Sequence, residues 1–297
     1  MYNENDMSER RLIVTHHAPD LDAIAATWIL KRFDSQHYAD AKVAFINPGE
    51  RIKPKQLEQH SVDMNLVTHV DTGLGKFDHH QPERAGKMIC AATLTHEYVC
   101  HLHPELEKDQ ALAEIVEFTN QIDHFQEIHW PDAGNTRYVM MIHEIMRGME
   151  LSQLHDDESK LYFGLRCLNY IYQALTNTIE AKKIIDRQGQ DFQINCGACL
   201  ALETSNEETL KEAQKMGYVL VVRKDANQGH IRIKARPDSC LDLKDLADNI
   251  KEEDDTGTWF YHPGGKMLLN GSTRHHDQVP SPLSLKKVVG MIKETYG

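Results

Sequence analysis

Acidic and histidine side chains are concentrated in two short stretches of this 297-residue sequence. The stretches are LIVTHHAPDLD, residues 12–22, and VDTGLGKFDHH, residues 70–80. Their candidate metal-binding side chains are His16, Asp20, Asp22, Asp71, Asp78, His79 and His80. So many carboxylates brought together would repel one another unless cations lay between them. Imidazole and carboxylate ligands without thiolate suit Mn²⁺, Mg²⁺, Fe²⁺ or Zn²⁺, and the number of ligands favours a centre of two ions.

The elements that would position these side chains are strands followed by helices. Each stretch begins with an apolar run that predicts a buried strand, and its polar residues follow at the carboxyl end, where ligands bind in open α/β sheets. Ala23–Phe33 has the apolar spacing of a helix with Asp22 at its N-cap. Lys42–Asn47 and Leu66–Val70 have the pattern of further strands. The alternating order of strands and helices predicts an α/β fold with a doubly wound, mainly parallel sheet.

Helices are expected between this sheet and the C-terminal part of the chain. Ala91–Leu102 and Leu106–Gln121 have apolar faces that can cover the sheet, and the second would position Asp123. Residues 138–192 predict a helical connector, with one or two helices within 160–192. The methionines in this stretch are expected to be flexible core filling. They are Met140, Met141, Met146 and Met149.

The sequence pattern changes near residue 196, where a smaller α+β domain is expected to begin. Strands are expected over 198–203, 218–223 and 230–236, and helices over 207–216, 243–251 and 285–296. We therefore expect a catalytic domain with its helical connector over 1–190 and a substrate-binding domain over 196–297. The acidic run 252–255 is expected to be a solvated loop. Free thiols are expected for all six cysteines, which are Cys90, Cys100, Cys167, Cys196, Cys199 and Cys240.

Four motifs resemble those of the DHH phosphoesterase superfamily, which includes RecJ-type exonucleases, nanoRNases and family II pyrophosphatases. HHAPDLDA fits the first motif, His-x-x-x-Asp-x-Asp, and VDTG fits the second. Asp78, His79 and His80 fit the third, and IVEFTNQIDHF supplies the aspartate of the fourth, Asp123. The resemblance covers about residues 11–125. Only residues 72–77 separate the second motif from the third, and this short gap resembles the branch that contains the melanocyte-proliferating-gene exonucleases.

This resemblance implies a role for each motif residue. One divalent ion would be held by His16, Asp20 and Asp71. The other would be held by Asp22, Asp71, His79 and Asp123, so that Asp71 bridges the two ions. His80 would face the phosphate of the substrate, and Asp78 would orient the histidine pair. The implied cofactor is two divalent ions, Mn²⁺ in preference to Mg²⁺. His17 falls outside the motif and is expected either to support a ligand or to face solvent.

A glycine-containing stretch in the C-terminal part, WFYHPGGKMLLNGSTRHH, is a candidate phosphate-binding segment. Its glycines would let the backbone approach a ligand closely, and donor side chains surround them. The candidate substrate-binding residues are His262, Gly264, Gly265, Lys266, Arg274 and His275. Superfamily members similarly carry a glycine-rich stretch in a second domain, but their Gly-Gly-Gly-His run is absent here. A plain surface loop with turn glycines is the alternative interpretation.

The charge balance limits the class of partner. The chain carries 45 acidic against 33 basic residues, a net charge of −12, so long duplex nucleic acid is a poor partner. A small phosphorylated molecule or a short single-stranded oligonucleotide fits better. The first ten residues lack the pattern of a secretory signal and no run has the length of a membrane span, so we expect a cytoplasmic location and no membrane partner. No pattern indicates an oligomeric state.

Together these features predict a hydrolase. The expected activity is divalent-metal-dependent hydrolysis of a nucleotide or short oligonucleotide phosphodiester, by two-metal activation of water. An inorganic pyrophosphatase or a phosphomonoesterase would use a similar centre. A non-catalytic module that binds a nucleotide signal would need only some of these ligands. The sequence leaves these alternatives open.

Overall fold

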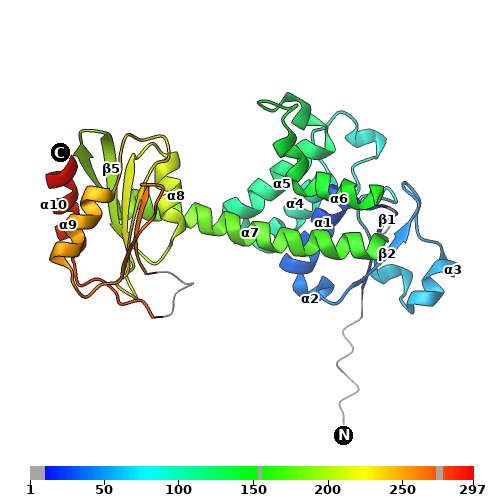
Figure 1. The fold of residues 1–297 in the computed structure, drawn as a ribbon. Coiled ribbons are helices and arrows are strands. Elements are labelled where there is room, and N and C mark those ends of the chain that lie inside the picture. Colours follow the sequence, from blue (N-terminus) through cyan, green and yellow to red (C-terminus); the bar gives the residue numbers. More distant parts are fainter. Residues whose placement is uncertain (1–10, 153–155, 272–276) are drawn as a thin grey trace, which may run out of the picture. The chain divides into compact units, whose positions relative to one another are not determined.

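The computed structural model describes residues 11–152, 156–271 and 277–297. The chain divides into two compact units, residues 1–173 and 174–297 (Figure 1). Helix α7, Asp157–Gln188, contains the division between them. None of the helices in the described ranges combines the length and the hydropathy that a bilayer span requires.

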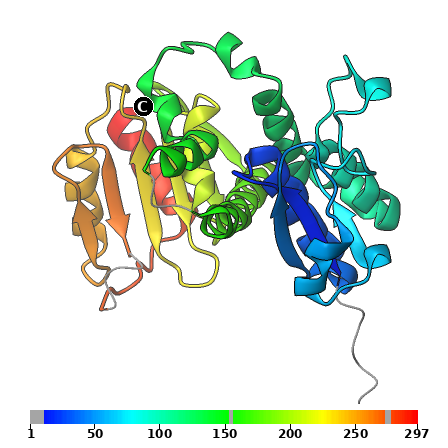
Figure 2. The same ribbon diagram turned by 90° about the vertical axis from the view of Figure 1, so that its right-hand side faces the viewer.

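The sheet of the first unit consists of three parallel strands in the order β2-β1-β3. The central strand is β1, Leu12–His16, with β2, Lys42–Ile46, on one side and β3, Val67–His69, on the other. Leu12 lies opposite Lys42 in one neighbour and opposite Val67 in the other. Figure 2 shows β1 and β2 side by side in blue. The α/β class with a parallel sheet is as the sequence predicts.

Alternation along β1 gives this sheet two buried faces. Ile13 packs with residues of the first helix such as Ala26 and Leu30. Leu12 and Val14 point the other way and pack with Ala44 and Ile46 of β2. Both faces of the strand that ends at His16 are therefore fixed by hydrophobic packing.

Helix α1, Leu21–Phe33, is buried over its first ten residues, which is typical of a core helix rather than an amphipathic surface helix. It contacts α4, Ala91–Leu102, and α5, Gln110–Asp123. The other α-helices described within this unit are α2 Ser35–Tyr38, α3 Pro54–Leu57 and α6 Ile142–Leu151. Short 3₁₀ helices complete it: Glu58–His60, Met64–Leu66, Pro82–Arg84, Pro104–Lys108, Gln126–His129 and Thr136–Met140.

The predicted connector, residues 138–192, contains α6 and then one long helix, α7, of 32 residues, which accounts for the one or two helices expected within 160–192. Helix α7 ends before Gly189, where a Cβ atom would lie 2.6 Å from the carbonyl oxygen of Ile185. The predicted methionine core filling is correct for Met146, which is buried, and wrong for Met140, which is 80% exposed. Met140 lies in a 3₁₀ turn rather than on the buried face of a helix.

The second unit is a six-stranded mixed sheet in the order β4-β5-β6-β7-β9-β8. Among its described strands, β5 and β6 alone pair in parallel. The strands are β4 Gln190–Ile194, β5 Gly197–Glu203, β6 Leu220–Lys224, β7 Ile231–Ala235, β8 Trp259–Tyr261 and β9 Met267–Asn270. In Figure 1, α9, Lys244–Glu253, and α10, Leu285–Tyr296, lie on one face, and α8, Glu208–Lys215, lies on the other.

Two expectations for the second unit are wrong. Asp254, in the acidic run expected to be solvated, is buried and accepts hydrogen bonds from Ser281, Trp259 and a backbone turn. Cys196 and Cys240, expected as free thiols, form a disulfide across 44 residues of sequence. No local pattern indicates that pairing, because the strands between the two cysteines bring them together.

Candidate metal centre

The first ligand segment is the turn between β1 and α1. His16 ends β1, and Asp20 is the N-cap of α1, accepting a hydrogen bond from the amide of Ala23 at 3.0 Å. The sequence predicted Asp22 as the N-cap, which is wrong because the helix already begins at Leu21. Asp22 instead points inward from the first turn of the helix and is 2% exposed.

The carboxylate of Asp22 lies at the start of another helix. Its oxygens accept hydrogen bonds from the amides of Ala91 and Ala92, the first residues of α4, at 2.6 and 2.7 Å. The positive end of a helix stabilises a carboxylate there. Burial, with the charges of Asp71, Asp20 and Asp123, nevertheless raises the pKa of Asp22 well above its usual range. This carboxylate therefore requires a further positive group to be ionised at low cost.

The second ligand segment is a tight loop from Asp71 to Asp78, which explains the short gap between two motifs. Asp71 has a φ of +53°, and its amide donates to the carbonyl of Phe77 at 2.8 Å, so the loop closes on itself. Asp78 is buried and accepts from the amide of Leu74 at 2.6 Å. Gly73, at φ +75°, packs so closely on His69 that a Cβ would lie 2.6 Å from its ring. The loop brings Asp71 and Asp78 together without an intervening strand and helix.

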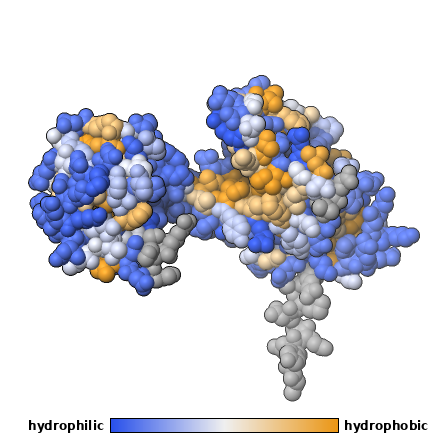
Figure 3. Space-filling model, viewed as in Figure 1, coloured by the Kyte–Doolittle hydropathy of each residue, from blue (hydrophilic) through white to orange (hydrophobic). Residues whose placement is uncertain are grey.

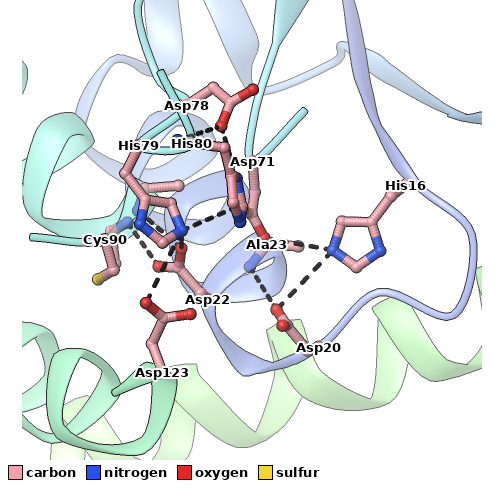
Figure 4. Close-up of polar contacts among 12 residues, drawn as sticks. His16, Asp20, Asp22, Ala23, Asp71, Asp78, His79, His80, Cys90 and Asp123 are labelled. Atoms are coloured by element: carbon pink, nitrogen blue, oxygen red, sulfur yellow. Dashed lines mark hydrogen bonds and ion pairs between the residues drawn. The ribbon is translucent and has the colours of Figure 1, made fainter. Parts of the chain in front are cut away.

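Asp71 lies between two groups of potential ligands, one near each carboxylate oxygen (Figure 4). Its Oδ2 is 3.2 Å from Nε2 of His16, and its Oδ1 is 3.4 Å from Nε2 of His79. Nε2 of His16 is also 4.0 Å from Oδ1 of Asp20. Nε2 of His79 is also 3.8 Å from Asp22 and 3.7 Å from Asp123, the last residue of α5.

These contacts form groups compact enough to hold an ion. His16, Asp20 and Asp71 make one group, and Asp22, His79 and Asp123 make another; in each, the ligand atoms lie within 4.8 Å of one another. Asp71, His79 and His80 make a third group that overlaps the second. The structure thus brings together all six side chains predicted as metal ligands. It also permits His80 to act as a ligand.

Several atoms of the centre fit a bound cation better than they fit the protein alone. Oδ1 of Asp71 and Nε2 of His79 are buried, and neither has a hydrogen-bond partner among the residues that the structure describes. Nδ1 of His16 donates to the carbonyl of His17 at 2.8 Å, which leaves the lone pair of Nε2 for a metal in the neutral ring. Unpaired buried polar atoms are costly, and an ion at this position would satisfy both.

Without a bound ion, protons on the histidines and carboxylates would offset the negative charge of this centre. Burial lowers the pKa of His16, but the hydrogen bond to Asp71 and the charge of Asp20 raise it to about 9. Burial also lowers the pKa of His79, which Asp71, Asp123 and Asp22 together raise to about 9. Burial raises the pKa of Asp123 to about 6. Ion binding at such a centre displaces protons.

Asp78 contacts His80, one member of the histidine pair that the resemblance implies it orients. Oδ1 of Asp78 accepts from Nδ1 of His80 at 2.8 Å and from its backbone amide at 3.0 Å. The imidazole of His80 is otherwise open, with 60% of its side chain exposed. His80 therefore lies at the edge of the centre, where its imidazole can donate a hydrogen bond.

The candidate substrate-binding residues of the second unit form a tight turn between β8 and β9. The amide of Gly264 donates to Nδ1 of His262 at 3.0 Å, and Gly265, at φ +72°, packs against Asp242. The ammonium of Lys266 donates to the carbonyls of Ser239 and Leu241 at 2.8 and 2.6 Å. Lys266 therefore holds a loop of its own unit. Arg274 and His275 lie outside the described residues.

Neighbouring residues that the motifs do not include also contact the centre. His124 places Nδ1 3.5 Å from Oδ2 of Asp123, and its adjacency to Asp123 in sequence is a signal that could have identified it. Lys160 and Asp157, from the first turn of α7, bond to Ala18 between His16 and Asp20. His17 is 54% exposed and binds Asp157, which agrees with a position beside the ligands.

No family model and no curated protein matches the chain. Among solved structures, it is similar to a DHH-domain protein from a family of ribosomal proteins, at 12% identity and a TM-score of 0.32, covering 97% of this chain and 86% of the other. It is also similar to an exonuclease RecJ bound to manganese, at 12% identity and a TM-score of 0.33, with coverage of 97% and 90%. A third is RecJ in complex with Mn²⁺ from Thermus thermophilus, at 11% identity and a TM-score of 0.32. There the match covers 97% of this chain and 52% of that one. These likenesses are too distant to carry an argument about activity, which depends here on the geometry of the site.

Proposed function

We propose that the chain is a divalent-metal-dependent phosphoesterase that hydrolyses a phosphodiester of a nucleotide or a short oligonucleotide. The observation that supports this most is the position of Asp71, whose oxygens each approach a different group of ligands. Bound divalent ions would supply Lewis-acid chemistry, activating water as the nucleophile and stabilising charge at phosphorus. The proposed ligands of one ion are His16, Asp20 and Asp71, and those of the other are Asp22, Asp71, His79 and Asp123.

Mn²⁺ is the proposed metal. The proposed ligands of the two ions are four carboxylates and two imidazoles. Mg²⁺ prefers oxygen ligands alone, so the imidazole nitrogens disfavour it. Mn²⁺ accepts both donor types. The burial of Asp22 and Asp71 would keep bulk water away from part of the centre and strengthen each charge interaction there.

His80 is the proposed contact to a non-bridging phosphate oxygen. Its exposed ring is fixed at one nitrogen by Asp78, so the other can donate to an oxygen when the ring carries both protons. Such a donor acts as an electrostatic aid aimed at charge that develops in the transition state. Asp78 acts through His80 as a positioning residue.

The proposed substrate is short. A chain with net charge −12 repels a long polyanion, whereas ions at the centre reverse the charge locally. The turn residues His262, Gly264 and Gly265 also remain proposed as substrate contacts, although hydrogen bonds within the turn use the backbone amides of all three. Lys266 is the weakest member of that set, because its ammonium already has two acceptors.

The test is a hydrolysis panel of short RNA and DNA oligomers, cyclic dinucleotides, adenosine bisphosphate and pyrophosphate, with Mn²⁺, with Mg²⁺ and with EDTA. Asp71→Asn should lower turnover at least about 100-fold, since even partners outside the ligand shell cost about 10- to 100-fold. Asp63→Asn, at an exposed position away from the centre, is the matched control. Full activity in a folded Asp71→Asn protein, or equal activity in EDTA, would overturn the proposal.

A further inference from the structure

A second concave site lies on the chain segment that follows the fourth motif. It is a cavity of about 470 Å³, within the size range of small-molecule sites. Residues of two 3₁₀ helices and of α6 line it, among them Glu127, Trp130, Tyr138, His143 and Arg147. None of these five residues belongs to the metal centre or to the candidate phosphate-binding turn.

Two polar atoms of this cavity are buried and unsatisfied. They are Oε2 of Glu127 and Nδ1 of His143, and within the described ranges neither has a hydrogen-bond partner. A buried acceptor or donor that is left unpaired destabilises the protein. A ligand that brings a donor to the carboxylate and a polar atom to the imidazole would satisfy both atoms.

The other walls of the cavity are aromatic. The rings of Trp130 and Tyr138 lie 5.6 Å apart, and Phe118 lies 5.7 Å from Trp130 and 5.8 Å from His143. Nε1 of Trp130 donates to Gln121 of α5 at 3.0 Å, so its ring is held in place. Fixed aromatic faces stack well on the flat face of a nucleobase.

Exposed hydrophobic side chains surround this site. Figure 3 shows hydrophobic residues gathered on the first unit near α5 and α6. The exposed apolar residues of this segment are Phe125, Ile128, Val139, Met140, Ile145 and Leu151. Val139 and Leu151 line the cavity itself. Exposed apolar side chains gathered around a cavity are consistent with a binding site.

From this arrangement we infer that the cavity binds a guanine base, stacked on Trp130 or Tyr138, with its N1–H and amino group donating to Glu127. An ionised carboxylate only accepts, and guanine offers two adjacent donors on one edge. His143 pairs with an acceptor of the same base. Adenine fits less well, because its ring nitrogen beside the amino group is an acceptor and would face the carboxylate.

The electrostatics of His143 agree with this pairing. Burial lowers the pKa of its imidazole, although the charges of Glu144 and Glu127 raise it in part. A neutral ring can donate from one nitrogen to O6 or N7 of guanine. At the rim, Arg147 pairs with Glu144 at 3.4 Å and leaves the carboxylate of Glu127 to the ligand.

This inference goes beyond the proposed function, because it assigns a guanine-binding site that is separate from the metal centre. Glu127 follows Asp123 by only four residues, and Trp130 is bonded to Gln121, two residues before Asp123. Gln121 and Asp123 are two residues apart on α5, so the cavity and the fourth-motif carboxylate lie on different sides of this helix.

The experiment measures binding of nucleosides, which carry no phosphate, to the full chain in EDTA by calorimetry and by tryptophan fluorescence. Guanosine should bind at least about tenfold more tightly than inosine, which lacks the amino group, and more tightly than adenosine. Glu127→Gln should abolish the preference for guanosine over inosine. Glu114→Gln, an exposed change on α5, should leave it intact. Equal affinities for guanosine and inosine, no guanosine binding, or an unchanged preference in Glu127→Gln would overturn the inference.

The two proposals fail separately. Guanosine binding in EDTA without any metal-dependent hydrolysis would sink the phosphoesterase and keep the base site. Hydrolysis that is lost in Asp71→Asn, without guanosine binding, would keep the phosphoesterase and sink the base site.

Discussion

The carboxylate of Asp157 accepts a hydrogen bond from the backbone amide of Ala18, with 2.7 Å between Oδ1 and N, although 139 residues separate them. Its other oxygen lies 2.6 Å from Nδ1 of His17. Lys160, one helical turn later, is itself buried; it donates to the carbonyl of Ala18 at 3.4 Å and forms an ion pair with the partly exposed Glu150. The first turn of α7 thus holds both polar backbone groups of Ala18.

Ala18 needs this support because its backbone is left-handed, with a φ of +51°. That conformation costs an L-residue about 1–2 kcal/mol. The residue lies midway between His16 and Asp20, two of the proposed ligands. The strain is therefore located where it fixes the distance between them.

We expect Asp157→Ala to lower the affinity for Mn²⁺ by about 10- to 100-fold, the usual effect of losing a partner outside the ligand shell. The fold should persist, because Asp157 is partly exposed and contributes no core packing. Calorimetric titration with Mn²⁺ measures the effect. Glu158→Ala, one residue further along the same helix turn, controls for the loss of an acidic residue near the helix start. Equal affinities in the two variants would refute a positioning role.

The convergence of the motif residues was predictable because it follows from strand ends. His16 ends β1, Asp71 follows the end of β3, and parallel strands deliver such residues to the same edge of a sheet. The support of Ala18 was not predictable. It depends on a contact between the first turn of α7 and a loop 139 residues away, and neither segment carries a local signal for it.

Two other outcomes show where pattern alone was insufficient. Asp22 looked like a helix cap, but the capping residue is Asp20, and Asp22 caps the start of α4 instead. Lys266 was expected to bind phosphate, but its ammonium donates hydrogen bonds to the carbonyls of Ser239 and Leu241. In both cases the side chain forms hydrogen bonds that the local pattern does not indicate. Its partner came from a distant part of the chain.

Asp123→Asn should stabilise the metal-free protein while weakening metal binding. Burial raises the pKa of Asp123 to about 6 in the folded protein, above its ordinary value of 3.8. The ionised carboxylate therefore destabilises the fold. This effect is largest above pH 6 and disappears below about pH 4. The variant should therefore gain about 1–3 kcal/mol in free energy of unfolding at pH 8 in EDTA, and gain nothing near pH 4. Urea unfolding at both pH values measures this, with Asp63→Asn as control. A loss of stability at pH 8 would contradict it.

Binding of Mn²⁺ should strengthen as the pH rises from 6 toward 9. His16 and His79, each with a pKa of about 9 in the metal-free centre, must lose a proton before they can ligate an ion. Below pH 9 the affinity should rise by up to about tenfold per pH unit for each proton displaced. Titrations in two buffers of different ionisation enthalpy would count the protons released at about pH 7.5. Asp71→Asn is the control, because Mn²⁺ that still binds to this variant is bound elsewhere on the surface. If Mn²⁺ binding to the unchanged protein released no protons, the expectation would be contradicted.

Asp254→Asn should destabilise the second unit at neutral pH. Despite its burial, Asp254 has its pKa lowered to about 2 by hydrogen bonds from Ser281, Trp259, Gly257 and Thr256. Because the pKa of Asp254 is lower in the folded protein than in the unfolded chain, ionised Asp254 stabilises the fold. This stabilisation is complete above the unfolded pKa near 3.8 and is lost as the pH falls through the folded pKa of about 2. The variant should lose about 2 kcal/mol in free energy of unfolding at pH 7, and much less at pH 2. Asp255→Asn, the exposed neighbour, provides the control. If both variants unfolded at the same urea concentration at pH 7, the acceptor role of Asp254 would be refuted.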